Sequence, residues 1–349
     1  LINAHCHLDY TCLRGTIPRQ NSFADWIRAI NAEKGKLGAD DYRRSISDGF
    51  REAREFGTSS LVNLTDVPEL ISRLEGAPLR TWWCPELLDI RPGATADQLL
   101  QFAAAATGQT RYRGLAPHAP YTASAQLYRA VDRARDFLPT THVAESFEEL
   151  QMFRFATGPL YDFLASIGRD MSDCGRRTPF AHLLELIANF RRGAGDTSRS
   201  PWLVVHVNEL VDDDWERIAR LPPLHVVHCP RSHRYFQHTR FAYERLRDNG
   251  ANICLGTDSL ASAPDLSLFA EMREFRRLRP HVSAREVIEL ATINGARALG
   301  QGAGLGQLSA GAFADMIAFP FSGDAVEAYE TIVGFDHPVS WTMIGGELV

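Results

Sequence analysis

The sequence predicts an α/β protein built on a (β/α)8 barrel, and three observations support this prediction. Eight short apolar runs are separated by stretches with helical periodicity, which is the pattern of buried parallel strands. Several of these runs end in histidine, as expected where strand C-termini meet at the mouth of a barrel. The chain has 349 residues, and such a barrel typically needs about 250, so a barrel with an appendage fits its length.

The predicted strands and helices alternate along most of the chain. The strands are residues 1–5, 59–64, 80–86, 113–117, 140–144, 203–206, 225–228 and 252–257. The helices are residues 40–56, 96–106, 123–137, 179–190, 213–221 and 241–249, several with apolar residues at three- and four-residue spacing. An open doubly wound sheet is the alternative. Its phosphate-binding glycines would follow the first strand, but the glycine cluster at 302–306 lies late in the chain.

The last part of the chain differs from the barrel. From Gly306 onward, residues 308–319 and 341–349 are short β segments separated by glycines. We therefore divide the chain into a barrel, residues 1–305, and the C-terminal strands of a small accessory sheet, residues 306–349. Such strands have unpaired edges, and a segment upstream of Leu1 is their expected partner.

Composition indicates a soluble globular protein and argues against two classes of function. Hydrophobic residues make up 45% of the chain and charged residues 23%, and no run approaches the ~18 consecutive apolar residues of a membrane helix. A formal charge of -6 without a basic block argues against binding nucleic acid. The six cysteines form no C-x-x-C pair, so we expect reduced, buried thiols and a cytoplasmic location.

Histidines at the predicted strand ends suggest a metal site. His5 and His7 are alternate residues, so both side chains would point to the same face of a strand. A lone pair of this kind is weak evidence, because alternate polar residues are common on half-buried strands. The further candidates at strand ends are His142, His206, His228 and Asp258. Together they indicate a catalytic centre at one end of the barrel.

The motifs and their order resemble the amidohydrolase superfamily, in the branch of cytosine, guanine and S-adenosylhomocysteine deaminases and triazine chlorohydrolases. The matching segments are NAHCHLD at 3–9, APHAPYT at 116–122, HVAE at 142–145, VH at 205–206, HCPRS at 228–232 and GTDS at 256–259. ATINGA at 291–296 and GAFAD at 311–315 also resemble the family. The resemblance implies a barrel with a β-sandwich built from both chain ends, of which residues 306–349 would be the C-terminal part.

By this resemblance, His5, His7, His142 and Asp258 would bind one divalent metal, with water in an open position. Zn²⁺ is the first expectation, with Fe²⁺ and Mn²⁺ as alternatives, because imidazole and carboxylate ligands accept all three. Such an ion lowers the pKa of bound water towards about 7. The only lysines are at positions 34 and 36, between the first two strands. No strand-end lysine is present to bridge two metals, so the site is predicted to be mononuclear.

Three further residues receive catalytic or binding roles. Glu145 would carry a proton between the attacking water and a ring nitrogen, and Asp258 would accept the other proton. His206 would stabilise charge on the tetrahedral oxygen. His118 would contact the substrate ring.

Substrate recognition is less well defined. The family's H-C-P-x-S-N stretch is HCPRSH here, so His233 replaces an asparagine. Arg231 could bind a carboxylate, which would favour an acid-bearing aminopurine derivative such as aminodeoxyfutalosine, or it could anchor a loop. His228 would contact the substrate or support a neighbour.

Two further polar segments have expected places. Residues 158–177 could cover the mouth through Tyr161, Arg176 or Arg177. The arginines at 273–279 are expected on a solvated helix face.

We therefore expect a metal-dependent hydrolase that deaminates an amino-substituted purine or nucleoside-like heterocycle and releases ammonia. A chlorohydrolase or another C–N hydrolase of the same superfamily is the first alternative, and retention of Glu145 favours ammonia release. A non-catalytic metal-binding barrel is the alternative of another class, against which the complete ligand set argues. We expect a small-molecule substrate and neither nucleic acid nor membrane as partner. A homodimer is the commonest closed assembly.

Overall fold

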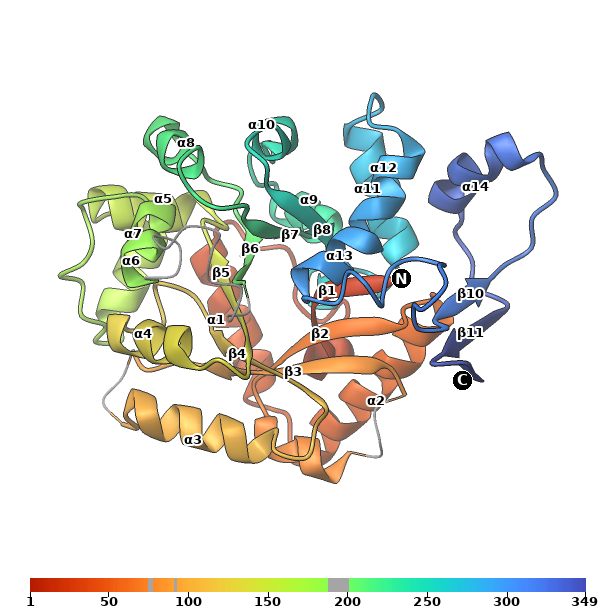
Figure 1. The fold of residues 1–349 in the computed structure, drawn as a ribbon. Coiled ribbons are helices and arrows are strands. Elements are labelled where there is room, and N and C mark those ends of the chain that lie inside the picture. Colours follow the sequence, from red (N-terminus) through yellow and green to blue (C-terminus); the bar gives the residue numbers. More distant parts are fainter. Residues whose placement is uncertain (75–77, 91–92, 188–200) are drawn as a thin grey trace.

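A computed structural model describes residues 1–74, 78–90, 93–187 and 201–349. Its main sheet has the strand order β8-β7-β6-β5-β4-β3-β2-β1-β9 (Figure 1). The strands are β1 Ile2–His7, β2 Ser60–Thr65, β3 Arg80–Leu87, β4 Tyr112–Pro117, β5 Leu138–Val143, β6 Leu203–His206, β7 His225–His228, β8 Asn252–Leu255 and β9 Asp258–Ser259. All neighbouring strands in this sheet are parallel.

The sheet closes into a barrel beside β1, where β9 joins the first strand to the segment that follows β8. β9 follows β8 after two residues and pairs with β1, with Cys6 opposite Asp258. The N–H of Thr257 donates to the carbonyl oxygen of His5 at 3.0 Å. The predicted barrel is thus confirmed, and its closure brings the end of the last strand beside the first.

Helices surround the sheet (Figure 1). They are α1 Phe23–Lys34, α2 Ala39–Glu55, α3 Ala96–Ala106, α4 Ala125–Arg133, α5 Phe147–Phe155, α6 Pro159–Ser166, α7 Pro179–Leu186, α8 Asp212–Ile218, α9 Pro230–Phe236, α10 Tyr243–Asp248, α11 Leu268–Leu278, α12 Ala284–Leu290, α13 Ile293–Ala298 and α14 Ala328–Gly334. The short 3-10 helices of the described residues are η1 Leu8–Leu13, η2 Pro68–Arg73 and η4 Ala325–Glu327. Many helices begin after a serine or threonine whose side chain accepts an N–H of the first turn, as Ser22 does for α1.

Most elements lie within a few residues of their predicted bounds, and β6 and β7 have the predicted bounds. The predicted helix 123–137 ends earlier, at Arg133, because β5 already begins at Leu138. The helix predicted at 179–190 is observed as α7 to Leu186, and its last three residues lie outside the described residues. The helix α1 was not predicted, although it proves important for the site.

Alternate residues of the strands belong to two separate apolar clusters. Val204 and Val226 pack with residues of the surrounding helices. Val205 and Val227 belong to another cluster, formed largely by strand residues. Because successive side chains of a strand point to opposite faces, the first cluster fills the layer between sheet and helices and the second fills the barrel interior.

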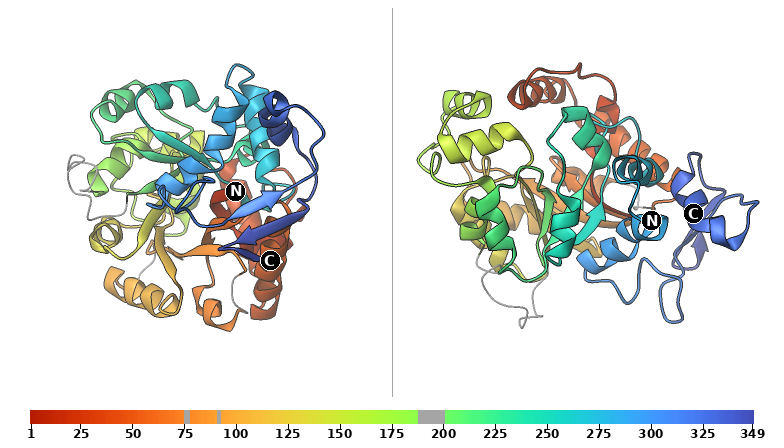
Figure 2. Two further views of the ribbon diagram at one scale, coloured as in Figure 1. Left: turned by 45° about the vertical axis from the view of Figure 1, so that its right-hand side comes forward. Right: turned by 90° about the horizontal axis from the view of Figure 1, so that it is seen from above.

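A small antiparallel sheet follows the barrel, in the order β10-β11-β12. Its strands are β10 Met316–Ala318, β11 Trp341–Ile344 and β12 Glu347–Leu348. The guanidinium of Arg80, at the start of β3, donates to both carboxylate oxygens of Asp315 at 2.9 and 3.0 Å, which attaches this sheet to the barrel. Both chain ends lie near it (Figures 1 and 2). The domain boundary between residues 305 and 306 stays a prediction.

None of the helices in the described part of the chain combines the length and the apolar character needed to cross a bilayer.

Candidate active site

Four predicted metal ligands meet at the C-terminal ends of β1, β5 and β8–β9. The Nε2 atoms of His5 and His142 are 3.3 Å apart, and Oδ1 of Asp258 lies 3.6 Å from Nε2 of His5 and 3.8 Å from Nε2 of His7. The possible ligand atoms of the three histidines all lie within 4.8 Å of one another. All four side chains are buried. The strand ends therefore bring the predicted ligands into one cluster.

The backbone around this cluster is strained. Ala144, His206 and Asp258 have positive φ angles of 50°, 76° and 60°, which are uncommon for residues other than glycine. Each residue lies at the C-terminal end of a barrel strand. Strain of this kind often accumulates where side chains must be aimed at a functional site.

The hydrogen bonds and charges of the cluster suit a divalent cation. Nδ1 of His142 lies 2.8 Å from the carbonyl oxygen of His118, so it must carry the proton, and Nε2 is left with a lone pair. Burial lowers the pKa of His142 to about 4 and that of His7 well below its usual value. Burial alone would raise the pKa of Asp258, but a hydrogen bond with His5 helps to hold it well below its usual range. Neutral imidazoles beside an ionised carboxylate are the ligand forms that Zn²⁺ takes.

Two proton-carrying side chains lie beside the ligand cluster. Oε1 of Glu145 is 3.5 Å from Nε2 of His206, and both side chains are buried. Burial, with the charges of Asp258 and Glu149, raises the pKa of Glu145 well above its usual value. The hydroxyl of Ser232 donates to Oδ2 of Asp258 at 2.6 Å. The surroundings thus favour the protonated form of Glu145 and the ionised form of Asp258.

A cavity of about 410 Å³ opens above the cluster. One wall is apolar and consists of Phe23, Trp26, Ile27 and Ile30 from α1 with Phe163, Leu164 and Ile167 from α6 and its end. The polar lining includes His7, Tyr10, Lys34, Asp66, Glu86, His118, His142, Glu145, His206 and Asp258. A cavity of this size, apolar with a few converging polar groups, is typical of a small-molecule site.

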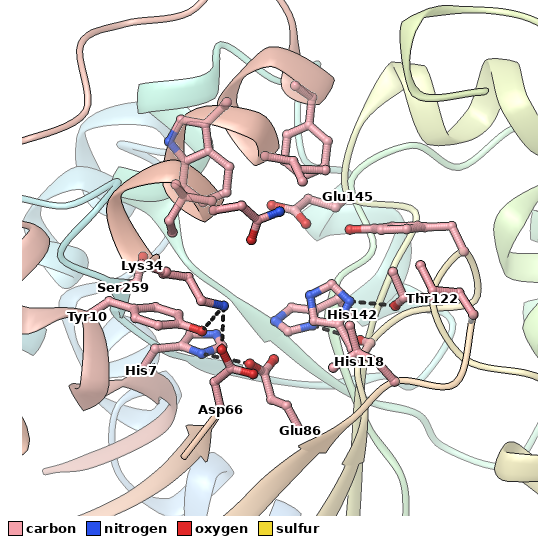
Figure 3. A pocket seen from close by; sticks show the side chains of 18 of the residues that line it. His7, Tyr10, Lys34, Asp66, Glu86, His118, Thr122, His142, Glu145 and Ser259 are labelled. Atoms are coloured by element: carbon pink, nitrogen blue, oxygen red, sulfur yellow. Dashed lines mark hydrogen bonds and ion pairs between the residues drawn. The ribbon is translucent and has the colours of Figure 1, made fainter. Parts of the chain in front are cut away.

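Lys34, Asp66 and Glu86 were not predicted as site residues. Lys34 Nζ lies 2.6 Å from Oδ2 of Asp66 and donates to the hydroxyl of Tyr10 at 2.8 Å (Figure 3). Glu86 faces Nδ1 of His7 at 3.9 Å, and burial, with the charge of Asp66, raises its pKa to about 8. Figure 3 shows Lys34 and Asp66 across the cavity from His118 and His142. Glu86 lies on the side of these two histidines, with a carboxylate oxygen within 4.8 Å of a ring nitrogen of each.

Comparison with known proteins agrees with this geometry. The profile of the amidohydrolase family matches residues 1–349. The chain belongs to the amidohydrolase family. Aminodeoxyfutalosine deaminase of Deinococcus radiodurans is 30% identical over 322 residues, which are 86% of this chain and 72% of that protein.

Two further comparisons concern a relative that matches a shorter part of the chain and the fold. A 5-methylthioadenosine/S-adenosylhomocysteine deaminase of Syntrophobacter fumaroxidans is 33% identical over 216 residues, 59% of this chain and 43% of that protein. The crystal structure of an adenosine deaminase from Xanthomonas campestris, with bound zinc, has a TM-score of 0.78 at 23% identity. It covers 100% of this chain and 79% of that one. The amidohydrolase is thus similar in sequence to deaminases and in fold to a zinc-containing one.

Of the three predicted substrate-contact residues of the amidohydrolase, one lines the cavity and two do not. His118 lines the cavity, and its Nδ1 lies 2.7 Å from the hydroxyl of Thr122. His228 and Arg231 do not belong to the described residues that line the cavity. The ring of His228 is stacked on Phe241, with centroids 3.9 Å apart. It therefore has the supporting position that was the alternative for this residue.

Arg231 has the position of a loop anchor, the alternative to a substrate contact. Its Nε and one terminal nitrogen donate to Glu271 and Asp265 at 2.7 Å each. Its other terminal nitrogen donates to the carbonyl oxygen of Asp265 at 2.6 Å. Arg231 is buried, and its guanidinium group already binds Glu271 and Asp265. A substrate carboxylate would have to displace these partners.

Two expectations about polar surfaces need correction. The segment 158–177 does border the cavity, but with apolar side chains of α6 rather than Tyr161 or the two arginines; Arg177 pairs with Glu185 instead. Arg279 is buried beside the rings of Phe241, Tyr243 and Phe275, so the arginine cluster at 273–279 is not wholly on a solvated face. Cation–π contact with the three rings explains how its charge is accommodated.

Proposed function

We propose that the chain is a metal-dependent hydrolase that removes an amino group from an aminopurine nucleoside or a similar heterocycle and releases ammonia. The observation that supports this most directly is the Glu145–His206 pair beside the four predicted metal ligands, at the base of a cavity large enough for a nucleoside. The similarity to proteins named as aminodeoxyfutalosine and 5-methylthioadenosine/S-adenosylhomocysteine deaminases points to the same reaction.

His5, His7, His142 and Asp258 would hold the metal. Their nitrogen and oxygen donors fit Zn²⁺ first and Fe²⁺ or Mn²⁺ as alternatives, and the zinc in the Xanthomonas campestris structure supports that order. When bound, such an ion supplies a water molecule of lowered pKa, so that hydroxide is available near neutral pH.

The protein's own residues would move the protons. Glu145, which is buried and whose pKa burial raises well above its usual value, donates a proton to a ring nitrogen and makes the adjacent amino-bearing carbon electrophilic. The oxygen of water then bonds to that carbon, while Asp258 accepts a proton from the water. His206 stabilises the charge on the added oxygen. The amino group takes up the proton held by Asp258, the carbon–nitrogen bond breaks and ammonia leaves, while Glu145 takes back a proton from the added hydroxyl group as the carbonyl of the product forms.

The apolar wall and His118 would hold the ring system, and Lys34 would discriminate between substrates. Lys34 is the only lysine or arginine among the described residues that line the cavity. An acid-bearing substrate would therefore bind Lys34 rather than Arg231, and it would have to compete with Asp66, which lies 2.6 Å from Nζ.

Replacing Lys34 by methionine tests this assignment. We expect kcat/KM for acid-bearing substrates to fall about tenfold more than for neutral ones, because a hydrogen bond to a charged group is worth about 1.5–3 kcal/mol. Lys36→Met is the matched control, because Lys36 is exposed and pairs with Glu33 outside the cavity. Equal losses for both substrate classes would contradict a role of Lys34 in binding an acid.

Ammonia release from a panel of aminopurines, their nucleosides and acid-bearing derivatives tests the proposed function. Release from at least one class is expected. Metal-loaded protein that releases no ammonia from the panel would contradict deamination, and the search would move to chloride and other leaving groups. Protein that binds metal but turns over no compound would favour a non-catalytic barrel. The cytoplasmic location and the homodimer stay predictions.

A further inference from the structure

The peptide of Glu145 is held from two sides. It follows Ala144, whose φ is 50°, so the chain turns sharply out of β5 at this point. The N–H of Glu145 donates to Oε2 of Glu149 at 2.8 Å. Its carbonyl oxygen accepts a hydrogen bond of 3.0 Å from Nδ2 of Asn208. Both contacts hold the backbone of Glu145, and they therefore fix the position from which its side chain extends.

Asn208 lies in the loop after β6 and is itself held in place. Its backbone N–H donates to the carbonyl oxygen of Ala144 at 2.8 Å, which ties this loop to the end of β5. Its side-chain oxygen lies 3.0 Å from Nδ1 of His233. Because the amide nitrogen already donates to Glu145, the atom that faces Nδ1 of His233 is an acceptor, and this contact requires the proton on Nδ1. The ring also makes a backbone hydrogen bond with Thr239.

His233 connects this pair to a rigid helix. It lies on α9 and is buried, and burial lowers its pKa to about 4, so the ring is neutral near pH 7. Two residues earlier, the N–H of Arg231 donates to Glu271 at 2.9 Å, which fastens α9 to α11. His233 stands where the family motif has asparagine. The ring and an asparagine amide both attach at Cγ, so Nδ1 and an amide nitrogen occupy similar positions.

We propose that His233 and Asn208 are positioning residues that fix Glu145 for proton transfer, with His233 acting through Asn208. The inference rests on the proposed function, because it assigns the two residues to the proton transfer by Glu145. Neither residue belongs to the predicted ligand set. Their loss should therefore change the rate of the chemical step and leave metal binding unchanged.

The size of the effect follows from the sensitivity of catalysis to geometry. Misplacing a reacting group by about 1 Å can cost about 10²-fold in rate. We expect His233→Leu, which fills part of the space of the ring but lacks the donor, to lower kcat about 10- to 100-fold. KM should change less than about threefold, because His233 is not among the described residues that line the cavity.

Two further variants separate positioning from stability. His233→Asn restores a nitrogen donor at Cγ and should keep kcat within about threefold of the wild type. His225→Leu is the matched control: it removes a histidine at the opposite end of β7 whose Nδ1 accepts from Asn252 at 2.9 Å, and it should leave kcat unchanged. Wild-type kcat in His233→Leu, or a loss in His233→Asn as large as in His233→Leu, would overturn the proposal.

The tautomer of His233 provides a readout that is independent of any substrate. In the wild type, ¹⁵N NMR should show the proton on Nδ1, and Asn208→Ala should shift it towards Nε2. A wild-type proton on Nε2 would overturn the proposal whatever the activity. If the wild type releases no ammonia from the panel, the proposed function fails, and the tautomer still decides whether the His233–Asn208 contact exists.

Discussion

Gly256→Ala should weaken the metal site through the backbone of His5. Gly256 lies between β8 and β9, and a Cβ at this position would be 2.8 Å from the carbonyl oxygen of His5 and 2.9 Å from its Cβ. Ordinary contacts of carbon atoms are at about 3.5–4.0 Å. The two strand ends would have to separate by about 0.6 Å, and no flexible side chain can absorb this shift, because both contacts are with atoms close to the main chain.

The magnitude follows from this overlap. Forcing an extra methyl group into a well-packed interior costs about 1–3 kcal/mol, and 2 kcal/mol corresponds to about a 30-fold change in the equilibrium constant of unfolding. The displaced strand end carries His5, so its imidazole moves relative to the other ligands. Changes that disturb ligand orientation without removing a ligand typically cost about 10- to 100-fold in metal affinity, and we expect a loss in this range.

Urea unfolding of the metal-free protein, together with metal titration, measures both effects. Gly334→Ala is the control, because a Cβ there has no neighbouring atom within 4 Å; it should leave metal affinity unchanged. Metal affinity and unfolding free energy in Gly256→Ala equal to those of the control would refute the reasoning, because the barrel would then have room at its point of closure.

Three further predictions concern single side chains. Glu145→Gln should lower kcat about 10²- to 10⁴-fold in an ammonia assay while metal stays bound, because the amide cannot carry the proton. His5→Ala should lose at least about tenfold in metal affinity by titration, because one ligand is removed. Arg231→Met should lower the unfolding free energy by about 3–5 kcal/mol in urea, because Glu271 stays buried without its partner. Burial raises the pKa of Glu271 to about 7 even beside Arg231, so the variant's stability should fall further as pH rises from 5 to 8.

Each of these predictions has a contradicting outcome. Normal turnover by Glu145→Gln would remove Glu145 from the proton transfer. A full metal complement with unchanged affinity in His5→Ala would show that the ligand assignment is wrong. Arg234→Met is the control for Arg231→Met, because Arg234 is exposed and its loss should cost less than about 1 kcal/mol. Equal stability of the two arginine variants would contradict the anchoring role of Arg231.

The barrel was predictable because its strands are short apolar runs that end in polar residues. β6 and β7 have their predicted bounds, since each ends at a histidine that follows apolar residues. The same rule placed His142 and Asp258 near His5, and the cluster follows from barrel closure at β9. Their roles as ligands stay predictions until a metal is measured.

The missed part of the site also had signals in the sequence. Phe23, Ile27, Ile30 and Lys34 recur at helical spacing after the N-cap Ser22, which predicts one face of a helix and places Lys34 on it. No helix is predicted for this stretch above, so both the apolar wall and its lysine are missed. Asp66 and Glu86 lie at the ends of β2 and β3, where the rule used for histidines would also have found them.

The role of Arg231 could not be predicted from the sequence in the same way. Its partner Glu271 lies 40 residues further along the chain, on α11. No local pattern connects the two, because their contact depends on how α9 and α11 pack. Position at a strand end thus predicted which residues gather at the barrel mouth. It did not predict which of them already form ion pairs within the protein, as Arg231 does.

Metal removal and stepwise reconstitution test the central claim most directly. Metal content and ammonia release would be measured on the same samples of the full chain, with the best substrate from the panel. The account predicts that activity disappears with the metal, returns in proportion to the metal bound and reaches its maximum near one ion per chain. Full ammonia release by metal-free protein, or a maximum only at two ions per chain, would contradict a mononuclear metal-dependent deaminase.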